Sequence, residues 1–413
     1  PGELPPVGSP VGPPVQTLEG VNNMQRPGIL PVGIPGGLNN TDRPGILLVG
    51  TPVATPGTST AESPGRLRNT VRFTVQRDSE QQEIEERRRR AIEDMRRRFR
   101  AVYDQNGTLR IRGKTVQAKV ADLINVNSAI KYGAFGSVRI CTFKGELMAV
   151  KEMSRSSNLD LWKMQIMDLE VATMTFDCPY IVQTYGYIIT DERVLVCMER
   201  LDICLNGVLE ETKNANIDEQ IVGQIAVSVL IALDYLKEKH TLIHRDVKPS
   251  NILVSSTGIF KLCDFGTSGH LIESMVKTRQ AGCRLYMAPE RLAPDAPEDY
   301  DVRSDVWSVG ITLVELARGI YPYSLLNNDC VFSEILQGEP PVLRQEEGFS
   351  HDFVDFIRLL LQKDVTHRPK YRNTMKPEDS LLENHFFKKC LRQLENEEVN
   401  VADWICDILT IKD

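Results

Sequence analysis

The sequence predicts an α+β protein of two lobes, a small β-rich lobe and a large mainly helical lobe, behind a disordered N-terminal extension. Three observations support this prediction. The composition of the 413-residue chain changes sharply near residue 65. Apolar and polar residues alternate about a glycine turn near residue 113, as they do in a β-hairpin. Between residues 130 and 370, seven short motifs follow one another in a fixed order, and the resemblance that they carry, described below, implies the two lobes.

The N-terminal 65 residues hold 13 of the 23 prolines and 12 of the 28 glycines of the chain. A segment of this composition cannot bury enough apolar surface to offset its chain entropy, so we predict that residues 1–65 are disordered.

A pattern Arg-Pro-x-x-Leu-x-Val occurs twice in this extension, and the second copy starts 17 residues after the first. The positions that define the two copies are Arg26, Leu30, Val32, Arg43, Leu47 and Val49. Each copy resembles docking peptides that bind MAP kinases, and two copies raise the effective concentration of a weak motif. A Pro/Gly repeat expanded by duplication is the alternative.

A basic, charged segment follows the extension. Residues 66–120 carry a net charge of +8, which leaves −15 for the rest of the chain. From Glu80 to Arg100, Glu–Arg pairs spaced four apart favour a solvated helix, so residues 66–107 are interpreted as a linker helix. The runs Arg87–Arg90 and Arg96–Arg98 could instead bind nucleic acid or direct nuclear import. Aromatic platforms are absent, so nucleic-acid binding is not expected.

A β-hairpin is predicted where Leu109–Ile111 and Val116–Val120 alternate about Gly113-Lys114. The folded domain is therefore expected to begin near residue 108.

The run His244–Asn251 is the most informative in the chain, and Asp264-Phe265-Gly266 begins thirteen residues beyond Asn251. Two acids, a lysine and an asparagine at this spacing suit phosphoryl transfer from a nucleotide. One carboxylate accepts the proton of the substrate hydroxyl, and the other holds magnesium together with the asparagine. The run resembles the catalytic and magnesium loops of eukaryotic protein kinases.

The remaining motifs of that family are also present in order. They are Gly133–Val138 (a glycine-rich loop), Ala149–Lys151, Ala288–Glu290, Asp305–Ser308 and His367–Pro369. Each has an ordinary explanation alone, since two glycines can mark a turn and an acid can lie on the surface. Seven in sequence favour a kinase fold, and the resemblance implies that Arg368 pairs with Glu290.

The resemblance implies ATP and Mg²⁺ as cofactors and assigns roles by motif. Asp246 would be the catalytic base, Lys248 and Lys151 would contact phosphate, and Asn251 and Asp264 would hold the metal. The expected nucleotide-binding residues are Ile130, Lys131, Gly133, Ala134, Phe135, Gly136, Val138, Ala149, Lys151, Met198, Glu199, Leu201 and Leu253. The apolar members of this set could equally be core residues.

The sequence departs from the family pattern at two positions. Lys131 stands where the first glycine of the loop is expected, which restricts the backbone and alters nucleotide affinity. The helix acid that should pair with Lys151 is either Asp168 or Glu170, which lie on different helix faces. The surrounding residues resemble those of stress-activated MAP kinase kinases, where an Asp fills the position, so Asp168 is chosen.

The segment between Asp264 and Ala288 narrows the resemblance to dual-specificity MAP kinase kinases that activate c-Jun N-terminal kinases. Ser274 and Thr278 match the activation pair of that branch, and Ala281–Arg284 also resembles it. The resemblance implies transfer to Thr and Tyr of a MAP kinase, and activation by phosphate on Ser274 and Thr278. A kinase kinase of the other stress-activated branch is the first alternative. A pseudokinase scaffold, favoured only by Lys131, is the second.

The resemblance also divides the chain. It implies a kinase domain at 108–390, with a small lobe to about 199 and a large lobe at 200–390, and then a tail at 391–413. Apolar residues recur at helical spacing in the tail, and the tail resembles the helix by which MAP kinase kinases bind upstream MAP kinase kinase kinases. The proposed contacts are Val401, Trp404, Ile405 and Ile408. Packing of this helix on the large lobe is the alternative.

No stretch approaches the ~18 apolar residues of a transmembrane helix, so no membrane association is expected. The nine cysteines are scattered without metal-ligand spacing, which indicates reduced thiols and a cytoplasmic protein, with a nuclear location left open. Cys204 lies near the expected nucleotide pocket, where a reactive thiol competes with simple partial burial.

Overall fold

The computed structural model of the chain describes residues 85–86, 89–90, 92–126, 131–133, 136–175, 177–264, 269–270, 284–293, 301–323 and 328–412. All of them belong to the compact unit Thr74–Asp413. The predicted disordered extension and both docking repeats lie outside the described residues.

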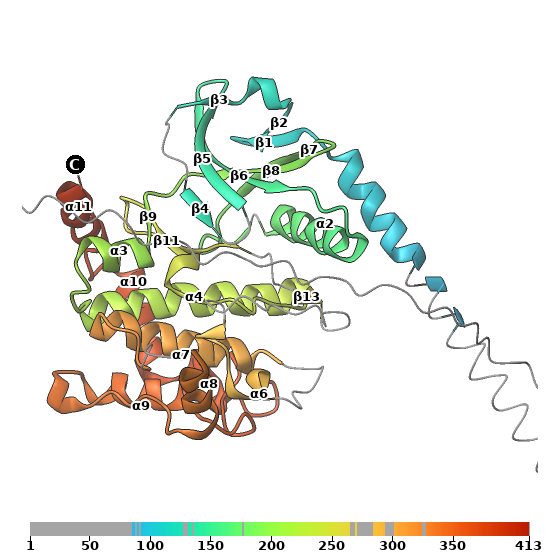
Figure 1. The fold of residues 1–413 in the computed structure, drawn as a ribbon. Coiled ribbons are helices and arrows are strands. Elements are labelled where there is room, and N and C mark those ends of the chain that lie inside the picture. The colour runs from blue at the N-terminus through green and yellow to red at the C-terminus, as the bar shows by residue number, and fades with distance from the viewer. Residues whose placement is uncertain are drawn as a thin grey trace, which may run out of the picture. The chain divides into compact units, whose positions relative to one another are not determined.

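The strands and helices alternate little along the chain, because most strands precede residue 200 and most helices follow it (Figure 1). The strands are β1 Thr108–Ile111, β2 Lys114–Gln117, β3 Ile124–Asn125, β4 Lys131–Gly133, β5 Gly136–Phe143, β6 Glu146–Ser154, β7 Thr184–Ile189, β8 Arg193–Glu199, β9 Ile203–Cys204, β10 Leu242–Ile243, β11 Ile252–Val254, β12 Phe260–Leu262 and β13 Gly269–His270. The helices are α2 Leu159–Met174, α3 Leu205–Glu211, α4 Glu219–His240, α6 Pro289–Leu292, α7 Arg303–Arg318, α8 Asn328–Gln337, α9 His351–Leu360, α10 His385–Glu395 and α11 Val401–Lys412. Residues 92–104 are also helical.

The small lobe is built on one antiparallel sheet. Within the described residues its strand order is β2-β1-β7-β8-β6-β5-β3, and β4 pairs with β5. Alternate residues of β8 enter two different apolar clusters, because successive side chains of a strand point to opposite faces. Val194 and Val196 pack toward α2, whereas Leu195 and Cys197 pack toward the β1–β2 hairpin. The sheet is therefore covered on both faces at this strand.

The predicted hairpin is confirmed, but its turn lies one residue earlier than expected. Leu109 pairs with Val116, and the two turn residues are Arg112 and Gly113, with φ angles of 48° and 73°. Positive φ at both central positions matches the twist of a two-residue hairpin, and glycine is favoured at such positions. Leu109 also pairs with Gly186 of β7, so the hairpin extends the sheet of the small lobe.

The basic helix is packed against the small lobe at its C-terminal end rather than solvated throughout. Val102 is 3% exposed and Phe99 packs in the same cluster as Trp162 of α2. The Tyr187 hydroxyl donates a hydrogen bond of 2.9 Å to the carbonyl of Val102. The side chain of Asn106 bonds both backbone groups of Ile189, at 2.7 and 3.1 Å. Phe99 and Val102, apolar residues in an otherwise charged helix, therefore form a packing surface.

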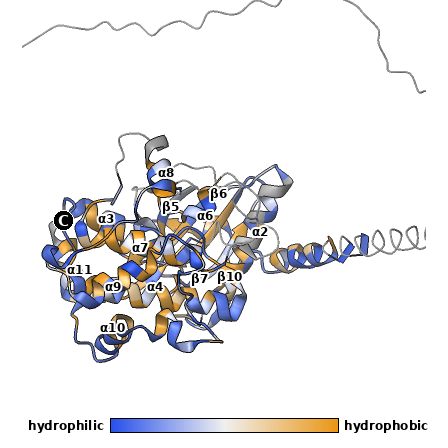
Figure 2. Ribbon diagram, turned by 90° about the horizontal axis from the view of Figure 1, so that it is seen from below, coloured by the Kyte–Doolittle hydropathy of each residue, from blue (hydrophilic) through white to orange (hydrophobic). Residues whose placement is uncertain are grey.

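The core of the large lobe forms around α4 and α7. Figure 2 shows apolar segments along both helices, and buried residues of both belong to one cluster. Asp218 caps α4 by accepting a 2.7 Å bond from the Gln220 N–H, and Thr241 ends it with φ 56°. Contrary to the expectation from sequence, α4 is long and apolar enough to cross a membrane. Its apolar window is 78% buried inside the protein, which is the environment of a core helix.

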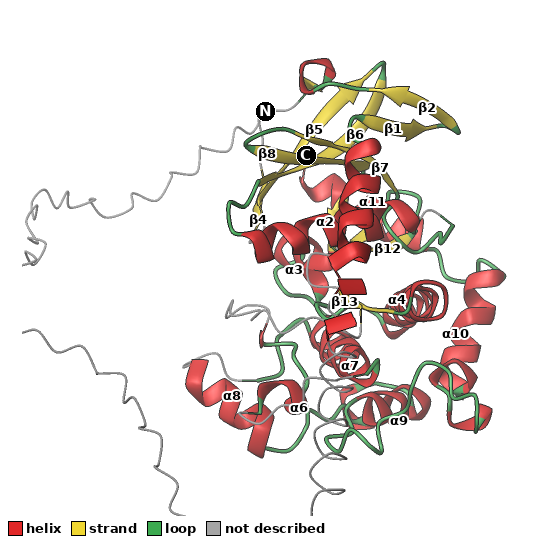
Figure 3. Cartoon of the chain, turned by 90° about the vertical axis from the view of Figure 1, so that its right-hand side faces the viewer, coloured by secondary structure: helices red, strands yellow, loops and turns green. Residues whose placement is uncertain are grey.

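The C-terminal helix packs on the large lobe, as the alternative interpretation predicted. It lies beside α3 (Figures 1 and 3). Val401, Ile405 and Ile408 are buried, and the Trp404 ring lies 6.3 Å from that of Phe260. Three of the four side chains expected to bind an upstream kinase are thus held against the chain's own core. They could meet a partner only if the helix detached.

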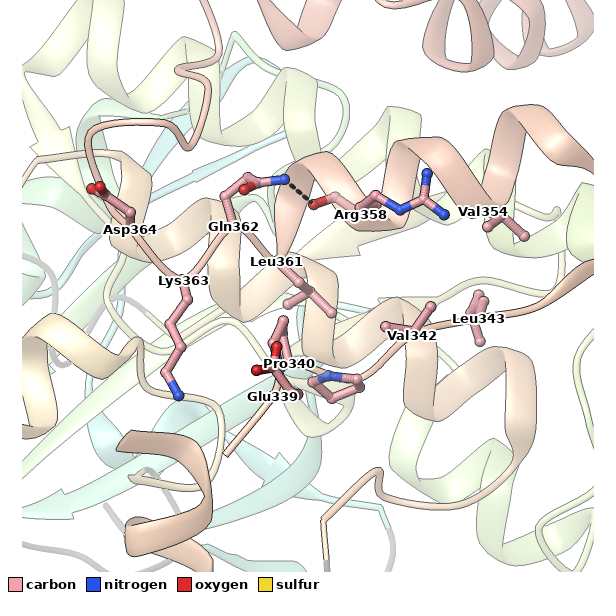
Figure 4. A pocket seen from close by; sticks show the side chains of 11 residues that line it. Glu339, Pro340, Val342, Leu343, Val354, Arg358, Leu361, Gln362, Lys363 and Asp364 are labelled. Atoms are coloured by element: carbon pink, nitrogen blue, oxygen red, sulfur yellow. Dashed lines mark hydrogen bonds between the residues drawn. The ribbon is translucent and has the colours of Figure 1, made fainter. Parts of the chain in front are cut away.

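A pocket of about 220 Å³ lies beside α9 (Figure 4). It is lined by Glu339, Pro340, Pro341, Val342, Leu343, Val354, Arg358, Leu361, Gln362, Lys363 and Asp364. None of these is a predicted site residue, so this pocket is separate from the site described next.

Candidate active site

The loop after β10 carries the predicted catalytic residues, and Asp305 of α7 fixes its shape. One carboxylate oxygen of Asp305 accepts a 2.8 Å bond from the His244 N–H, and the other accepts a 2.7 Å bond from the Arg245 N–H. Arg245 has φ 73°, which a non-glycine residue adopts only when its surroundings impose it. Asp305 is 0% exposed, so both charge-assisted bonds are shielded from water.

The side chain of Asp246 is buried and held from one side. Its Oδ2 accepts bonds from the Lys248 ammonium at 2.7 Å and from the Asn251 amide at 2.9 Å. The same amide also donates to the backbone carbonyl of Asp246, at 2.7 Å. Oδ1 of Asp246 is buried and has no hydrogen-bond partner among the described residues. A fixed carboxylate with one unpartnered oxygen is suited to accept a proton from a hydroxyl group.

Lys151 of β6 and Asp264 come together from opposite lobes. The Lys151 ammonium lies 2.7 Å from Oδ1 of Asp264, and both side chains are only about one-fifth exposed, at 17% and 21%. Asp264 lies two residues after the end of β12 and, like Arg245, is a non-glycine residue in the left-handed region, with φ 66°. The structure thus places a cation and a carboxylate at the junction of the two lobes.

In the described part of the glycine-rich loop, the lack of space for a side chain explains the glycine at position 136. Gly136 has φ 134°, and a Cβ at this position would lie 2.1 Å from the carbonyl oxygen of Glu152. Any other residue would therefore force β5 away from β6. Lys131 and Gly133 belong to β4, and Lys131 pairs with Val138 across the turn. Ile130, Ala134 and Phe135 lie outside the described residues.

The other expected nucleotide contacts lie on adjacent strands. Val138 pairs with Lys151, and Ala149 pairs with Met198, so these residues share one region of the sheet. Glu199 and Leu201 continue the chain from Met198, and Leu253 on β11 pairs with Cys204 of β9. Val138, Ala149, Lys151 and Met198 therefore lie together in one sheet, whereas Leu253 belongs to the separate sheet β12-β11-β9, and the nucleotide contacts stay a prediction.

The side chain of Asp168 lies outside the described residues, so its pairing with Lys151 stays a prediction. Glu170, the competing acid, has an oxygen 3.8 Å from a guanidinium nitrogen of Arg98 in the basic helix. Its carboxylate therefore faces the N-terminal helix. Ser274 and Thr278 also lie outside the described residues.

The predicted pair of Arg368 and Glu290 is confirmed. Two guanidinium nitrogens lie 2.8 and 3.2 Å from the two carboxylate oxygens, and the Arg368 side chain is fully buried. The guanidinium also donates to the carbonyls of Gln362 and Arg303. This pair joins the end of the activation segment to the helical core.

The buried carboxyl of Glu315 supports the same segment. Tyr286 donates a 2.6 Å bond to Glu315 of α7, and Tyr321 bonds the Leu285 carbonyl. Burial raises the pKa of the Glu315 carboxyl above its usual value of 4.5, while the Tyr286 hydroxyl acts in the opposite direction. Sequence reasoning missed this contact, because Glu315 stands alone in an apolar helix with no motif around it.

The candidate magnesium ligands offer a small set of oxygen donors. No cluster of three or more His, Cys, Asp or Glu side chains able to hold a metal occurs in the described part of the chain. Asn251 directs its amide nitrogen to Asp246, so the oxygens that would hold magnesium are its carbonyl oxygen and those of the Asp264 carboxylate, one of which also accepts from Lys151. Magnesium is usually held by one or two such groups plus phosphate and water, so these residues fit magnesium bound with a nucleotide.

The thiols near this site are free. Cys204 is partly exposed and Cys263 directly precedes Asp264. Burial raises the pKa of the Cys263 thiol well above its usual value. Cys263 is therefore a poor nucleophile, since the thiolate is the reactive form.

The fold and this set of residues define a protein kinase, and the protein kinase domain family matches residues 124–378 of the chain. The dual specificity mitogen-activated protein kinase kinase 7 of Homo sapiens is 45% identical over 317 residues, which cover 76% of this chain and 73% of that protein. The mitogen-activated protein kinase kinase mek-1 of Caenorhabditis elegans is 45% identical over 306 residues, 74% of this chain and 84% of that protein. The chain belongs to the dual-specificity mitogen-activated protein kinase kinases. A third relative, hemipterous of Drosophila melanogaster, is 42% identical over 316 residues, 75% of this chain and 26% of that protein.

Proposed function

We propose that this kinase transfers the γ-phosphoryl group of ATP to a threonine and a tyrosine in the activation loop of a c-Jun N-terminal kinase. The observation that carries the proposal is the geometry of Asp246, whose Oδ2 is held by Lys248 and Asn251 while Oδ1 has no partner among the described residues. A scaffold without activity would have no need for a base fixed in this way. The resemblance of the activation segment to that branch supports the choice of substrate.

Each catalytic group has a role that its contacts support. Asp246 orients the substrate hydroxyl and accepts its proton through Oδ1. Lys248 stabilises the Asp246 carboxylate at a distance of 2.7 Å and would share the charge of the transferred phosphate. Lys151 would hold the α- and β-phosphates, and Asn251 and Asp264 would hold magnesium. Magnesium-ATP, when bound, supplies the phosphoryl group and neutralises its charge.

Binding of ATP would change the contact between Lys151 and Asp264. The two side chains neutralise one another at 2.7 Å without a nucleotide. The Lys151 ammonium would then pair with phosphate oxygens and the Asp264 carboxylate with magnesium, so each side chain would keep a partner of charge opposite to its own. The site is therefore prepared for the nucleotide without leaving an isolated charge.

The partners are proposed from sequence. The two Arg-Pro-x-x-Leu-x-Val repeats would select the downstream MAP kinase, and two weak motifs on one chain raise the effective concentration. An upstream MAP kinase kinase kinase would phosphorylate Ser274 and Thr278. If that enzyme uses the C-terminal helix, the packed positions leave Asp403 and Cys406, which are exposed, on the accessible face.

The test uses the full chain with acidic substitutions at Ser274 and Thr278, magnesium-ATP and inactive MAP kinases of each branch. Phosphate mapped to both Thr and Tyr of the c-Jun N-terminal kinase loop is the expected result. Transfer only to another branch would keep the mechanism and overturn the choice of substrate.

Two controls complete this experiment. The chain phosphorylated by an authentic upstream kinase guards against failure of the acidic substitutions. A variant with Arg26→Ala and Arg43→Ala should lose selectivity for c-Jun N-terminal kinase while keeping its ATP turnover. If even the phosphorylated chain transfers nothing to any MAP kinase, the scaffold alternative replaces this proposal.

A further inference from the structure

Lys261 and Glu199 form an ion pair that links the connection between the lobes to the strand leading into the magnesium loop. The Lys261 ammonium lies 2.7 and 2.8 Å from the two carboxylate oxygens of Glu199. The two side chains are 16% and 20% exposed, so solvent screens the pair only in part. Lys261 is on β12, three residues before Asp264, and Glu199 directly follows Met198 at the end of β8.

The segment just before β7 takes part in the same arrangement. The Gln183 N–H donates a 2.6 Å bond to a carboxylate oxygen of Glu199, and the Glu199 N–H donates a 2.9 Å bond to the Gln183 carbonyl. The Glu199 carboxylate is therefore held by the small lobe through Gln183 and by the large lobe through Lys261.

Backbone bonds join the same two pieces of chain directly. The Leu262 N–H donates to the Tyr180 carbonyl at 2.8 Å, and the Val182 N–H donates to the Leu262 carbonyl at 2.9 Å. Ile181 and Leu262 thus form an isolated parallel bridge. Residues 180–183, Glu199 and residues 261–262 form one cross-linked unit, which we name the hinge clamp.

Rotation of one lobe relative to the other would change the distances between the residues of the hinge clamp. A change in the direction of the chain at Glu199 would lengthen two charge-assisted hydrogen bonds to Lys261, and these bonds weaken steeply with poor geometry. The clamp therefore favours one position of the Met198–Leu201 segment relative to β12. The expected nucleotide-binding residues Met198, Glu199 and Leu201, which would face the adenine ring, belong to the first of these elements, and Asp264 follows the second.

We propose that Lys261 and Glu199 are positioning residues that align the adenine-binding segment with the magnesium-binding Asp264, so that one nucleotide can reach both. Neither side chain touches the reacting atoms. The proposal concerns the ATP site of the proposed reaction but not the protein substrate, so nucleotide binding can test it even if the substrate is different.

The test compares Lys261→Met and Glu199→Gln with Lys261→Arg, which keeps the charge and the capacity for two hydrogen bonds. Arg193→Met is the matched control, because Arg193 pairs with Glu152 at the same distance of 2.7 Å but within the small-lobe sheet. The measurements are the Kd of magnesium-ATP by calorimetry, the KM for ATP, kcat and the melting temperature.

Lys261→Met is expected to raise both Kd and KM for ATP about 5- to 20-fold while kcat changes less than about two-fold, since a partly screened charged hydrogen bond is lost. Lys261→Arg should have the Kd of the unaltered chain. The double variant Lys261→Met/Glu199→Gln should have a Kd no higher than that of whichever single variant binds ATP less tightly, because both substitutions remove the same interaction. Arg193→Met should bind ATP as the unaltered chain does.

Three outcomes would overturn the proposal. They are an unchanged Kd in both Lys261→Met and Glu199→Gln, a lower melting temperature without a change in Kd, and a higher kcat with unchanged Kd. If Lys261→Met does not fold, Glu199→Gln provides the same readout, because it keeps the shape of the side chain. Failure of the substrate proposal would leave these Kd values measurable, so the two failures can be told apart.

Discussion

Arg368 and Glu290 face one another as two parallel forks in the interior of the large lobe, with nitrogen–oxygen distances of 2.8 and 3.2 Å. The guanidinium also lies over the Trp307 ring, 5.1 Å from its centroid. Ser304 donates a further bond of 3.0 Å to Glu290, so the carboxylate is held by two residues. The segment that ends at Glu290 is therefore attached to the core independently of the catalytic loop.

The first prediction concerns this pair. Arg368→Met should lower the free energy of unfolding by about 3–5 kcal/mol, because it leaves the Glu290 carboxylate buried without its main partner. Urea denaturation measures the change. Arg318→Met is the control, since Arg318 pairs with Glu347 where both side chains are about 30% exposed, and it should cost below about 1 kcal/mol. Equal losses in the two variants would contradict this account.

The second prediction concerns the base. Asp246→Asn should lower the rate of phosphoryl transfer by about 10²–10⁴-fold, because an amide cannot accept the proton of the substrate hydroxyl. Magnesium-ATP affinity and the melting temperature should stay close to those of the unaltered chain. Asp403→Asn, at an exposed position of α11, is the control for the chemical change itself. Undiminished turnover of Asp246→Asn would refute the assignment.

The third prediction concerns Asp305, which holds the catalytic loop through two backbone N–H groups. Asp305→Asn keeps the size of the side chain, but it places an amide nitrogen, which cannot accept a hydrogen bond, opposite one of the two backbone N–H groups. We expect kcat to fall at least about ten-fold and stability to fall by about 1–3 kcal/mol. Stopped-flow or steady-state transfer assays and urea titration measure these changes. Asp352→Asn, near the surface and paired with His385, should alter neither.

The fourth prediction concerns pH. The pKa of Glu315 is raised in the folded protein, so the folded state binds this proton more tightly than the unfolded state does. The contribution of Glu315 to stability is therefore most favourable below about pH 4.5 and declines as pH rises through the raised value. Glu315→Gln retains an oxygen for the Tyr286 hydroxyl and has no charge to bury.

The stability of Glu315→Gln relative to the unaltered chain should therefore increase between pH 4.5 and pH 8. Denaturation curves at a series of pH values test this dependence. Glu347→Gln serves as a control of opposite sign when the series is extended below pH 4.5, because the Arg318 guanidinium lowers the pKa of Glu347 and its contribution to stability is lost only as pH falls through that lowered value. A constant difference across the series for Glu315→Gln would show that its carboxyl keeps an ordinary pKa.

The fifth prediction concerns the C-terminal helix. Ile405 is 0% exposed, so Ile405→Ala should lower stability by about 2–5 kcal/mol through lost contacts and a cavity. Asp407→Ala, on the exposed side of α11, should change stability by less than about 0.5 kcal/mol. If Ile405→Ala weakens binding of an upstream kinase without a loss of stability, the helix is not packed in solution.

The sequence predicted those contacts of the site whose residues belong to one motif and lie close together along the chain. Asp246, Lys248 and Asn251 lie within six residues, so their contact follows from one short loop. The pair of Arg368 and Glu290 spans 78 residues and could be expected only from the family resemblance.

Other contacts had no local signal. Lys261 and Glu199 are ordinary charged residues in strands of two different sheets, and only the packing of one sheet against the other brings them together. Phe99 and Val102 belong to a segment dominated by arginine, where the few apolar residues determine what the helix packs against. The hairpin turn was displaced by one residue because Arg112 adopts a positive φ that sequence patterns assign to glycine.

The β1–β2 hairpin covers one face of the small-lobe sheet. This cover limits how far the protein can be shortened from its N-terminal side. The kinase family match begins at residue 124, yet Leu109 and Ala118 from the hairpin pack on Phe143, Met148 and Val150 of the sheet. A fragment cut at residue 124 would expose these side chains together, and a contiguous apolar surface of this kind promotes aggregation. Expression of a soluble catalytic fragment therefore requires a start before residue 92, so that the helix and the hairpin are both retained.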